Sequence, residues 1–517
     1  MSANIRKIDV ETSPQGRAGR WWALAALVIS GLVIGLDTTI LITALPTLSA
    51  KLGATTSDLQ WISAAYTLTL GGLLLPAGVL GDRYGRKRLL LVGLTLFGLT
   101  SVIASQATTA TTLIAMRALM GVGAALIVPL SLSILPTLFT AEERPRAISV
   151  TAAGAFLGLP LGPLVAGWLL THYAWGSVFL INAPVVVIAL VGVWFLVPES
   201  KDPSPRAFDW VGGLLAVIGV TALVYGVIEQ PIHGWTDPRV LAGIIGGALV
   251  LAAFVVWDVR QPSPFVDLRN FRSRGFTWAT MAFVVTGFAL FGVMFILTPY
   301  IQIVLGNDAQ ATGIRLLPLI GGVIGGAVLG NVVAARLGAK VGVSAGLAAA
   351  AAALVGFSRI SADTGYGLVA AAMIVLGVGI GIALPTSLDV ILGTIPPAQT
   401  GAGSALTRAL QQIAATFGVA ILGSILNSAY QSQIAPQLAA LPSAARDAAL
   451  GSLAGAHAVA AHLPASIRSA VVSAANQSYA RGTGDVMLVS AGLVLAAAIA
   501  IAVFLPARVS PMVAGDA

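Results

Sequence analysis

The sequence predicts an all-α integral membrane protein, and three observations lead to this fold class. Fourteen apolar segments are each long enough to cross a bilayer, which takes about 20 residues in a helix. Of the 517 residues, 57% are hydrophobic and only 9% are charged, whereas soluble domains carry roughly 25% charged residues. The basic residues gather in short segments between the apolar ones, as they do at the cytoplasmic face of a membrane.

The predicted spans follow one another with short polar connections. Twenty of the 28 Lys and Arg residues fall on the face that would hold both termini, seven fall on the other face, and Arg117 lies within a span. This bias predicts that the tails 1–20 and 507–517 are cytoplasmic, and it accounts for the net charge of +8 without nucleic acid. The spans are expected at 21–47, 57–80, 89–106, 111–139, 147–171, 174–198, 210–230, 240–258, 276–304, 312–335, 341–361, 364–392, 402–434 and 484–506.

An internal repeat indicates two related halves. The segment 121–133, GVGAALIVPLSLS, resembles the segment 377–389, GVGIGIALPTSLD. Pro46 corresponds to Pro299, and the charged loop after the second span has a degenerate copy at 336–340. We therefore expect two six-helix halves that share one architecture.

The repeat also sets the predicted domain boundaries. The first half is expected at 21–198 and the second at 276–506, with an inserted pair of spans and its linkers at 199–275. Within the second half, 435–482 reads as a long, polar outer loop with short helices, one of them starting at Pro464. One alternative is that this loop forms a lid over the outer mouth.

The most charged stretch joins the second and third spans and reads GVLGDRYGRKRLL, from Gly78 to Leu90. Its glycines allow a tight turn between two helix ends, and its basic residues stay out of the hydrocarbon. The stretch resembles the loop motif of the major facilitator superfamily, G-x-L-a-D-R-x-G-R-K-x-x-L. The alternative is a stop signal at the membrane face with no further role. The resemblance implies a conformational latch made by Gly78, Asp82, Arg83, Gly85 and Arg86.

The first span carries a buried acid. Its segment GLDTTILITALP resembles the L-D-x-T-I-V-N-V-A-L-P pattern of the fourteen-helix drug–proton antiporters, with Ile42 where the pattern has Asn. Asp37 would lie about ten residues, or ~15 Å, from the outer end of its helix. A carboxylate at that depth is costly unless it faces a wet cavity or a cation, so Asp37 is a candidate to exchange a proton for a cationic substrate. The alternative is a structural acid in helix packing.

The fourth span carries an arginine at a similar predicted depth. The segment LIAMRALMGVGAA resembles the superfamily pattern R-x-x-x-G-x-G-A-A, with Arg117 as its basic residue. Arginine stays protonated, so we expect Arg117 to favour the charged form of a carboxylate partner, and we propose Asp37 as that partner. The alternative is an arginine whose side chain reaches up to the outer interface.

The fifth span resembles the antiporter motif of the superfamily, G-x-x-x-G-P-x-x-G-G. It reads GAFLGLPLGPLVAG from Gly154 to Gly167, with Ala166 in place of one glycine. Glycines four residues apart make a smooth stripe for close helix contact, and proline removes a backbone hydrogen bond. The alternative is ordinary glycine-rich packing. The motif residues are Gly158, Gly162, Pro163 and Gly167.

Further residues are candidates for the substrate path. Asp389, near the inner end of the twelfth span, is either a second acid on that path or a solvated residue at the interface. Gln411 and Gln412 stand where some relatives have acids, which favours lipophilic monocations or neutral drugs over dications. Aromatic side chains could stack on planar cations, and the candidates for an apolar cavity are Trp61, Tyr66, Phe156, Phe291 and Phe295.

The resemblance covers 21–506 and implies the major facilitator fold with an inserted helix pair. It implies alternating access and proton-coupled export of lipophilic, cationic drugs across a bacterial-type cell (inner) membrane. We expect a monomer in the lipid bilayer whose partners are a lipophilic small molecule and H⁺. The proton gradient would drive it, so no cofactor is expected, and the four histidines form no metal cluster.

Two other function classes stay open. One is an exporter of the same fold that moves a single metabolite, lipid or self-made antibiotic. The other is a membrane enzyme or structural assembly protein, which the missing catalytic clusters disfavour. The chain has no cysteine, so disulfides and thiolate metal sites are excluded.

Overall fold

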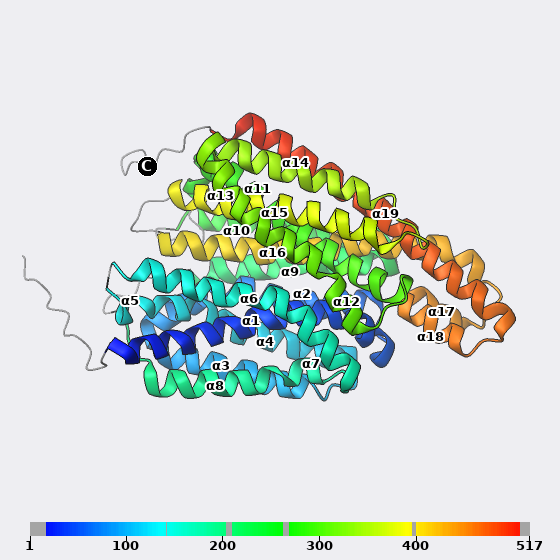
Figure 1. Ribbon diagram of the computed structural model, residues 1–517, viewed down its shortest axis with the longest axis horizontal. Helices are drawn as coiled ribbons and strands as arrows, with labels where there is room; N and C mark the ends of the chain where they lie inside the picture. The colour runs from blue at the N-terminus through cyan, green and yellow to red at the C-terminus, as the bar shows by residue number, and fades with distance from the viewer. Residues whose placement is uncertain (1–16, 141, 203–208, 262–267, 395–399, 507–517) are drawn as a thin grey trace, which may run out of the picture.

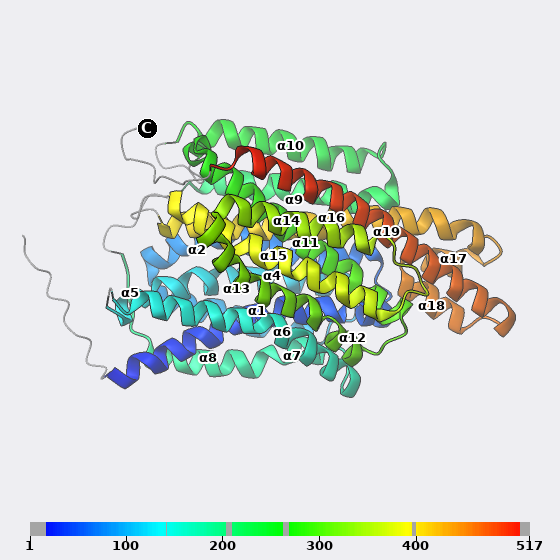
Figure 2. The same ribbon diagram turned by 45° about the horizontal axis from the view of Figure 1, so that its top comes forward.

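A computed structural model shows long helices that run roughly side by side (Figure 1, Figure 2). It describes residues 17–140, 142–202, 209–261, 268–394 and 400–506, apart from some side chains within these ranges. Thirteen helices in this part of the chain are long and apolar enough to cross a membrane. A further helix of 29 residues, α6 (Arg144–His172), takes the place of the predicted span at 147–171.

The first half is built from pairs of packed helices. α1 packs along α6 and α8, α2 packs along α4, and α3 lies between α4 and α8. Short helices α5 and α7 lie in the connections before α6 and α8. The bounds are α1 (Arg17–Leu52), α2 (Thr56–Tyr84), α3 (Arg86–Ala104), α4 (Ala110–Ser133), α5 (Leu135–Leu138), α7 (Ser177–Leu180) and α8 (Asn182–Leu196).

The second half repeats this arrangement. α13 packs along α15, α11 along α16, and α14 along α15 and α19. A 3₁₀ turn, η1, precedes α11, the π-helical turn η2 continues it, and a second 3₁₀ turn, η4, follows α16. The bounds are η1 (Leu268–Arg272), α11 (Arg274–Pro299), η2 (Tyr300–Val304), α12 (Ala309–Arg315), α13 (Leu317–Leu337), α14 (Ala339–Phe357), α15 (Tyr366–Thr394), α16 (Thr400–Ile434), η4 (Ala435–Leu438) and α19 (Ala465–Phe504).

Equivalent glycines make equivalent contacts in the two halves. A methyl group on Gly121 of α4 would lie 2.5 Å from a backbone oxygen of α2, and one on Gly377 of α15 would lie 2.9 Å from a backbone carbon of α13. Gly85 and Gly338, the turn glycines of the charged loop and of its copy, have φ angles of 116° and 87°. L side chains rarely adopt such angles, so the sequence repeat corresponds to a structural one.

The inserted pair consists of α9 (Trp210–His233) and α10 (Pro238–Asp258). α9 packs against α10, and it also touches α2 of the first half and α16 of the second. Its apolar face meets Leu68 and Ala420. Ser424 donates a hydrogen bond to the Val227 carbonyl at 2.8 Å, and the indole of Trp61 donates one to Glu229 at 3.2 Å. The inserted pair is therefore held by both halves.

The predicted outer loop at 435–482 is largely helical. It holds α17 (Ser443–Gly451), α18 (Leu453–Ala461) and the first turns of α19, which begins directly after Pro464 as expected. α19 has 40 residues, about twice the length that crosses a bilayer, so part of it extends beyond the bundle. We call α17 and α18 the cap.

The cap marks one end of the molecule. Figure 1 shows α17 and α18 at the end opposite to the start of α1 and the finish of α19. We call the end with α17 and α18 the cap end and the opposite end the terminal end. Both described chain ends lie at the same end of the bundle, as an even number of crossings requires.

Candidate functional site

A buried ion pair joins α1 to α4. Nη1 of Arg117 lies 2.6 Å from Oδ2 of Asp37, and the two side chains are only 1% and 2% exposed. The structure thus confirms the predicted pairing of these residues. Taking two charges out of water costs several kcal/mol per ion, so such a pair persists only when further hydrogen bonds satisfy it.

The second carboxylate oxygen is satisfied from α8. Asn182 donates a hydrogen bond to Oδ1 of Asp37 at 3.1 Å, and its amide also lies 3.0 Å from the Ser101 hydroxyl. Ser101 in turn donates to the Phe179 carbonyl at 2.8 Å. Sequence reasoning missed Asn182. The available signal was a single amide side chain within an otherwise apolar predicted span.

Arg117 is also fixed by α2. Its guanidinium carbon lies 4.1 Å from the centre of the Tyr66 ring, a cation–π contact. Its Nε donates to the Ile62 carbonyl at 3.3 Å. Four helices of the first half therefore hold the charged pair, and contacts on several sides restrict the guanidinium.

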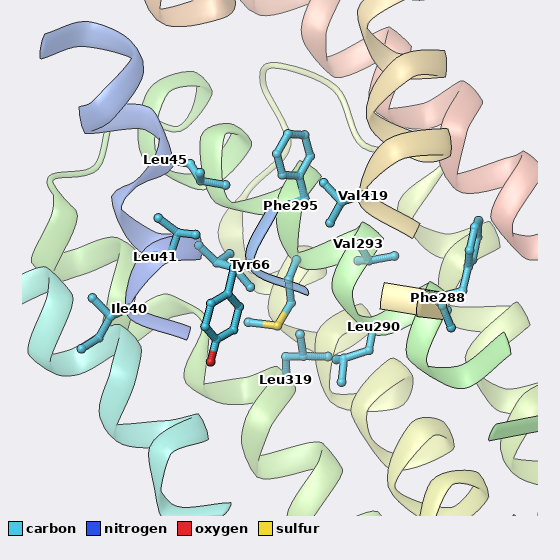
Figure 3. Close-up of a cluster of buried hydrophobic side chains, with 14 of the residues drawn as sticks. Ile40, Leu41, Leu45, Tyr66, Phe288, Leu290, Val293, Phe295, Leu319 and Val419 are labelled. Atoms are coloured by element: carbon cyan, nitrogen blue, oxygen red, sulfur yellow. The ribbon is translucent and has the colours of Figure 1, made fainter. Parts of the chain in front are cut away.

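A small cavity lies beside this pair, where the two halves meet. Its volume is about 30 Å³, enough for roughly two water molecules. Asp37 itself is not in the lining, so the cavity reaches the carboxylate through Arg117 and the neighbouring Thr38. Figure 3 shows Tyr66 beside Leu41 of α1, and Phe295 of α11 beside Val419 of α16.

Only some of the predicted cavity residues lie at the cavity. Tyr66, Phe291 and Phe295 line the cavity, as expected. Trp61, expected there, packs instead against α9, with its ring centre 6.1 Å from that of Tyr225. The side chain of Phe156 lies outside the described residues.

The polar candidates of the second half lie away from this cavity. Gln411 packs against Gly287 of α11, and Gln412 packs against Gly71 of α2. Neither contributes to the cavity lining. Asp389 is exposed and lies within two turns of the end of α15, so of the two readings its position fits a solvated residue better.

The antiporter motif on α6 contacts two different helices. Gly158 and Gly162 face α1: a methyl group on Gly158 would lie 2.5 Å from the Leu36 nitrogen, and Thr39 donates to the Gly158 carbonyl at 2.9 Å. Gly167 faces α12 of the second half, where a methyl group would lie 2.7 Å from a backbone oxygen. The motif therefore supports the helix segment that carries Asp37 and also brings the halves together.

Gly158→Val should disrupt this contact strongly. The neighbouring atoms belong to the α1 backbone, which cannot rotate away, so we expect the upper part of the 1–3 kcal/mol range for overpacking, or more. Gly321→Val is the matched control, because nothing lies within 4 Å of a methyl group at that position. Thermal unfolding of the purified variants, followed by tryptophan fluorescence, measures both. Equal losses in melting temperature would contradict the packing role.

The charged loop is fixed to α4. Nε of Arg86 donates a hydrogen bond to Oδ1 of Asp82 at 2.9 Å, and the two side chains form an ion pair with Nη2 2.8 Å from the same oxygen. Arg86 also donates a bond to the Ser133 carbonyl at 3.0 Å. Gly78 faces Pro129 of the same helix. Arg83 lies 5.6 Å from the Tyr84 ring centre. In this conformation the side chains of Asp82 and Arg86 bind within the first half, while their backbones bond the linker at Asp202 and Ser200. The latch role stays a prediction.

Glu199, which sequence reasoning did not single out, caps the start of α3. Its two carboxylate oxygens accept hydrogen bonds from the backbone nitrogens of Lys87 and Arg88 at 3.1 and 3.2 Å. The first N–H groups of a helix lack partners within the helix, and a negative charge there is favourable. The linker to the inserted pair is therefore fastened to the charged loop.

Glu199→Ala is expected to weaken this junction by about 1 kcal/mol, the typical effect of losing a helix cap. We expect a lower melting temperature and a protease-sensitive linker after residue 199. Glu142→Ala removes an exposed acid from a loop of the same half and serves as the control. If both variants behave alike in limited proteolysis, the capping role is wrong.

Comparison with known proteins agrees with this fold. The sequence model of the Major Facilitator Superfamily matches residues 27–419. The chain belongs to the major facilitator superfamily. It is therefore a membrane transporter, and the predicted fold class is confirmed.

Among similar superfamily members is the multidrug efflux pump LfrA of Mycolicibacterium smegmatis, which is 34% identical over 97% of this chain and 99% of its own length. The tetracenomycin C resistance and export protein of Streptomyces glaucescens is 31% identical over 81% of this chain and 78% of its own. A solved bacterial homologue of the human lysosomal transporter Spinster, in an inward-facing, unoccupied conformation, superposes with a TM-score of 0.66 at 16% identity. It covers 96% of this chain and 100% of its own and shows the shared fold alone.

Proposed function

We propose that this transporter is a drug–proton antiporter that exports lipophilic, cationic drugs across a bacterial cell membrane, with both termini in the cytoplasm. The observation that carries the proposal is the buried Asp37–Arg117 pair beside a cavity between the halves. The relative LfrA, named a multidrug efflux pump, supports the substrate class. The proposal needs no cofactor and is framed for a monomer.

The proposed exchange follows from charge balance at Asp37. A lone carboxylate buried in protein is costly, so in each state it is neutralised by the Arg117 guanidinium, by a proton, or by the positive charge of the cargo. A proton that arrives from outside displaces the cargo, and cargo that arrives from inside displaces the proton. Asn182 stays bound to the other carboxylate oxygen and keeps the group oriented.

The size of the central cavity indicates a conformation that is too closed to hold a drug. Small-molecule sites usually measure 300–1,000 Å³, whereas the space beside Arg117 measures about 30 Å³. Cargo enters only when α11 and α16 move away from α1 and α2. The proposal therefore includes alternating access of the two halves, with the loop around Asp82 as the latch of one state.

Ethidium transport in everted membrane vesicles tests this proposal. The vesicles come from a pump-deleted host that expresses the protein, and respiration acidifies their interior. Ethidium is expected to accumulate inside, with each addition of dye releasing protons, and nigericin, which collapses the pH difference, is expected to stop both. Accumulation that is insensitive to nigericin would contradict proton coupling.

An exporter of one specific compound is the second candidate. It is favoured by the Streptomyces glaucescens relative, which is named for resistance to and export of tetracenomycin C. A panel of unrelated lipophilic cations and neutral drugs in the same vesicles separates the two. Broad extrusion supports the multidrug proposal, and transport of a single compound supports the specialist.

A further inference from the structure

A second cavity of about 30 Å³ lies between the central cavity and the cap. Helices of both halves contribute to its walls, and α18 of the cap closes it. Phe295 lines this cavity as well as the central one. Phe295 is therefore the residue shared by the space beside Arg117 and the space under the cap.

One polar group in the second cavity has no partner. The side chain of Asn427 is only 3% exposed, and its amide oxygen accepts no hydrogen bond from any described residue. A buried acceptor without a donor is unfavourable, because it has given up its hydrogen bonds to water. Asn427 also belongs to the lining of the second cavity, so a ligand held there would be placed to supply the missing donor.

The other polar groups of the wall are already engaged. The hydroxyl of Tyr430 donates to the Ala449 carbonyl at 2.9 Å, and that of Tyr479 donates to the Ile296 carbonyl at 3.1 Å. Their rings and that of Phe295 leave aromatic surface around Asn427. Aromatic faces attract cations, while the lining contains no carboxylate, so a cation would be held here without a permanent countercharge.

The cap closes this cavity across the boundary between the halves. Ser452 at the start of α18 shares a hydrogen bond with Ser49 of α1 at 2.9 Å. Thr56 of α2 donates to the Gly451 carbonyl at 3.1 Å. Because the cap belongs to the second half by chain connectivity, these bonds must break when the halves separate at this end.

We propose that the second cavity is an exit subsite for aromatic cations that carry N–H donors. Cargo leaves Asp37, passes Phe295, and is held by the Asn427 amide oxygen and the aromatic rings until the cap releases. This inference rests on the proposed export function. A site without a carboxylate suits an exit position, because it binds the cation more weakly than Asp37 does.

Protection of a single introduced thiol tests the subsite, since the chain has no cysteine of its own. Ala454→Cys places a thiol in the lining, and Ser432→Cys places one on an exposed position of α16. N-ethylmaleimide labels each purified variant, without a proton gradient, in the presence of rising ethidium. We expect ethidium to slow labelling at position 454 and not at position 432.

A second substitution tests the role of the amide. Asn427→Leu keeps the approximate shape and removes the acceptor, so the ethidium concentration that protects position 454 should rise about tenfold, as expected for the loss of about 1.4 kcal/mol. Tetraphenylphosphonium is a lipophilic cation without N–H donors, and its protection should stay unchanged. Asn331→Leu, at an exposed position of α13, is the matched control and should alter neither probe.

Three outcomes overturn the subsite: no protection at position 454, equal protection at position 432, or an equal loss for both cations with Asn427→Leu. The last would show a structural role for Asn427. The labelling needs no proton gradient, so it fails independently of the vesicle experiment. Export that depends on the gradient without protection at position 454 would remove the subsite alone.

Discussion

Asp37→Asn is expected to reduce proton-driven ethidium export to the level of vesicles without the protein. The substitution keeps the size of the side chain and removes the group that takes the proton. Arg117 then lies 1% exposed without its countercharge. Substrate-induced proton release should disappear together with export, and both are measured in the everted vesicles described above.

Two matched variants separate the chemistry at Asp37 from damage to the fold. Asp37→Glu keeps a carboxylate and should retain part of the coupled export. Asp389→Asn neutralises an exposed acid of the second half and should export as the unaltered chain does. Normal proton release from Asp37→Asn would remove this residue from the mechanism, whereas loss in Asp389→Asn as well would point to a second acid on the path.

Arg117→Ala is expected to cost about 3–5 kcal/mol of stability, because removing one partner of a buried pair leaves the other charge uncompensated. The cation–π contact with Tyr66 and the bond to the Ile62 carbonyl are lost as well. Thermal unfolding of the purified variant should show a clear fall in melting temperature, and coupled export should cease.

The double variant with Asp37→Asn isolates the interaction of the two charges. The stability changes caused by substituting two residues in direct contact do not add up in such a cycle. The double variant should therefore melt above the Arg117→Ala single variant, since it buries no lone charge. Arg117→Lys keeps the charge and loses the forked geometry of the guanidinium. Its melting temperature should therefore lie between those of the unaltered chain and of Arg117→Ala. Simple additivity of the two single variants would contradict a functional ion pair.

Much of the fold could be predicted because the signals of a membrane helix lie within its own stretch of sequence. Span length and charge bias each depend on about 20 neighbouring residues. The repeat was readable because Gly85 and Gly338 occupy turns that demand the same backbone conformation. The helical cap was only partly foreseen, since its polar, alanine-rich sequence has no long apolar run.

The site was less predictable because it depends on contacts between distant segments. Asp37 and Arg117 could be matched by their depth in two helices, which is a local property of each. Asn182 meets Asp37 across 145 positions of the chain, and Glu199 meets Lys87 across 112. Trp61 was expected at the cavity because it is aromatic, yet which face of α2 turns towards α9 depends on helix packing that a single sequence does not specify.

The contacts of α9 with both halves restrict how the two halves can separate. α2 and α16 cannot part near α9 without loss of the bond from Ser424 to Val227 or of the bond from Trp61 to Glu229. On the side drawn in front in Figure 1, Gly167 of α6 lies against Ala309 of α12, and Gly313 of α12 lies against Pro163 of α6, whereas α9 and α10 are drawn behind. The inserted pair therefore adds polar bonds on one side of the bundle that must break before the halves can separate there.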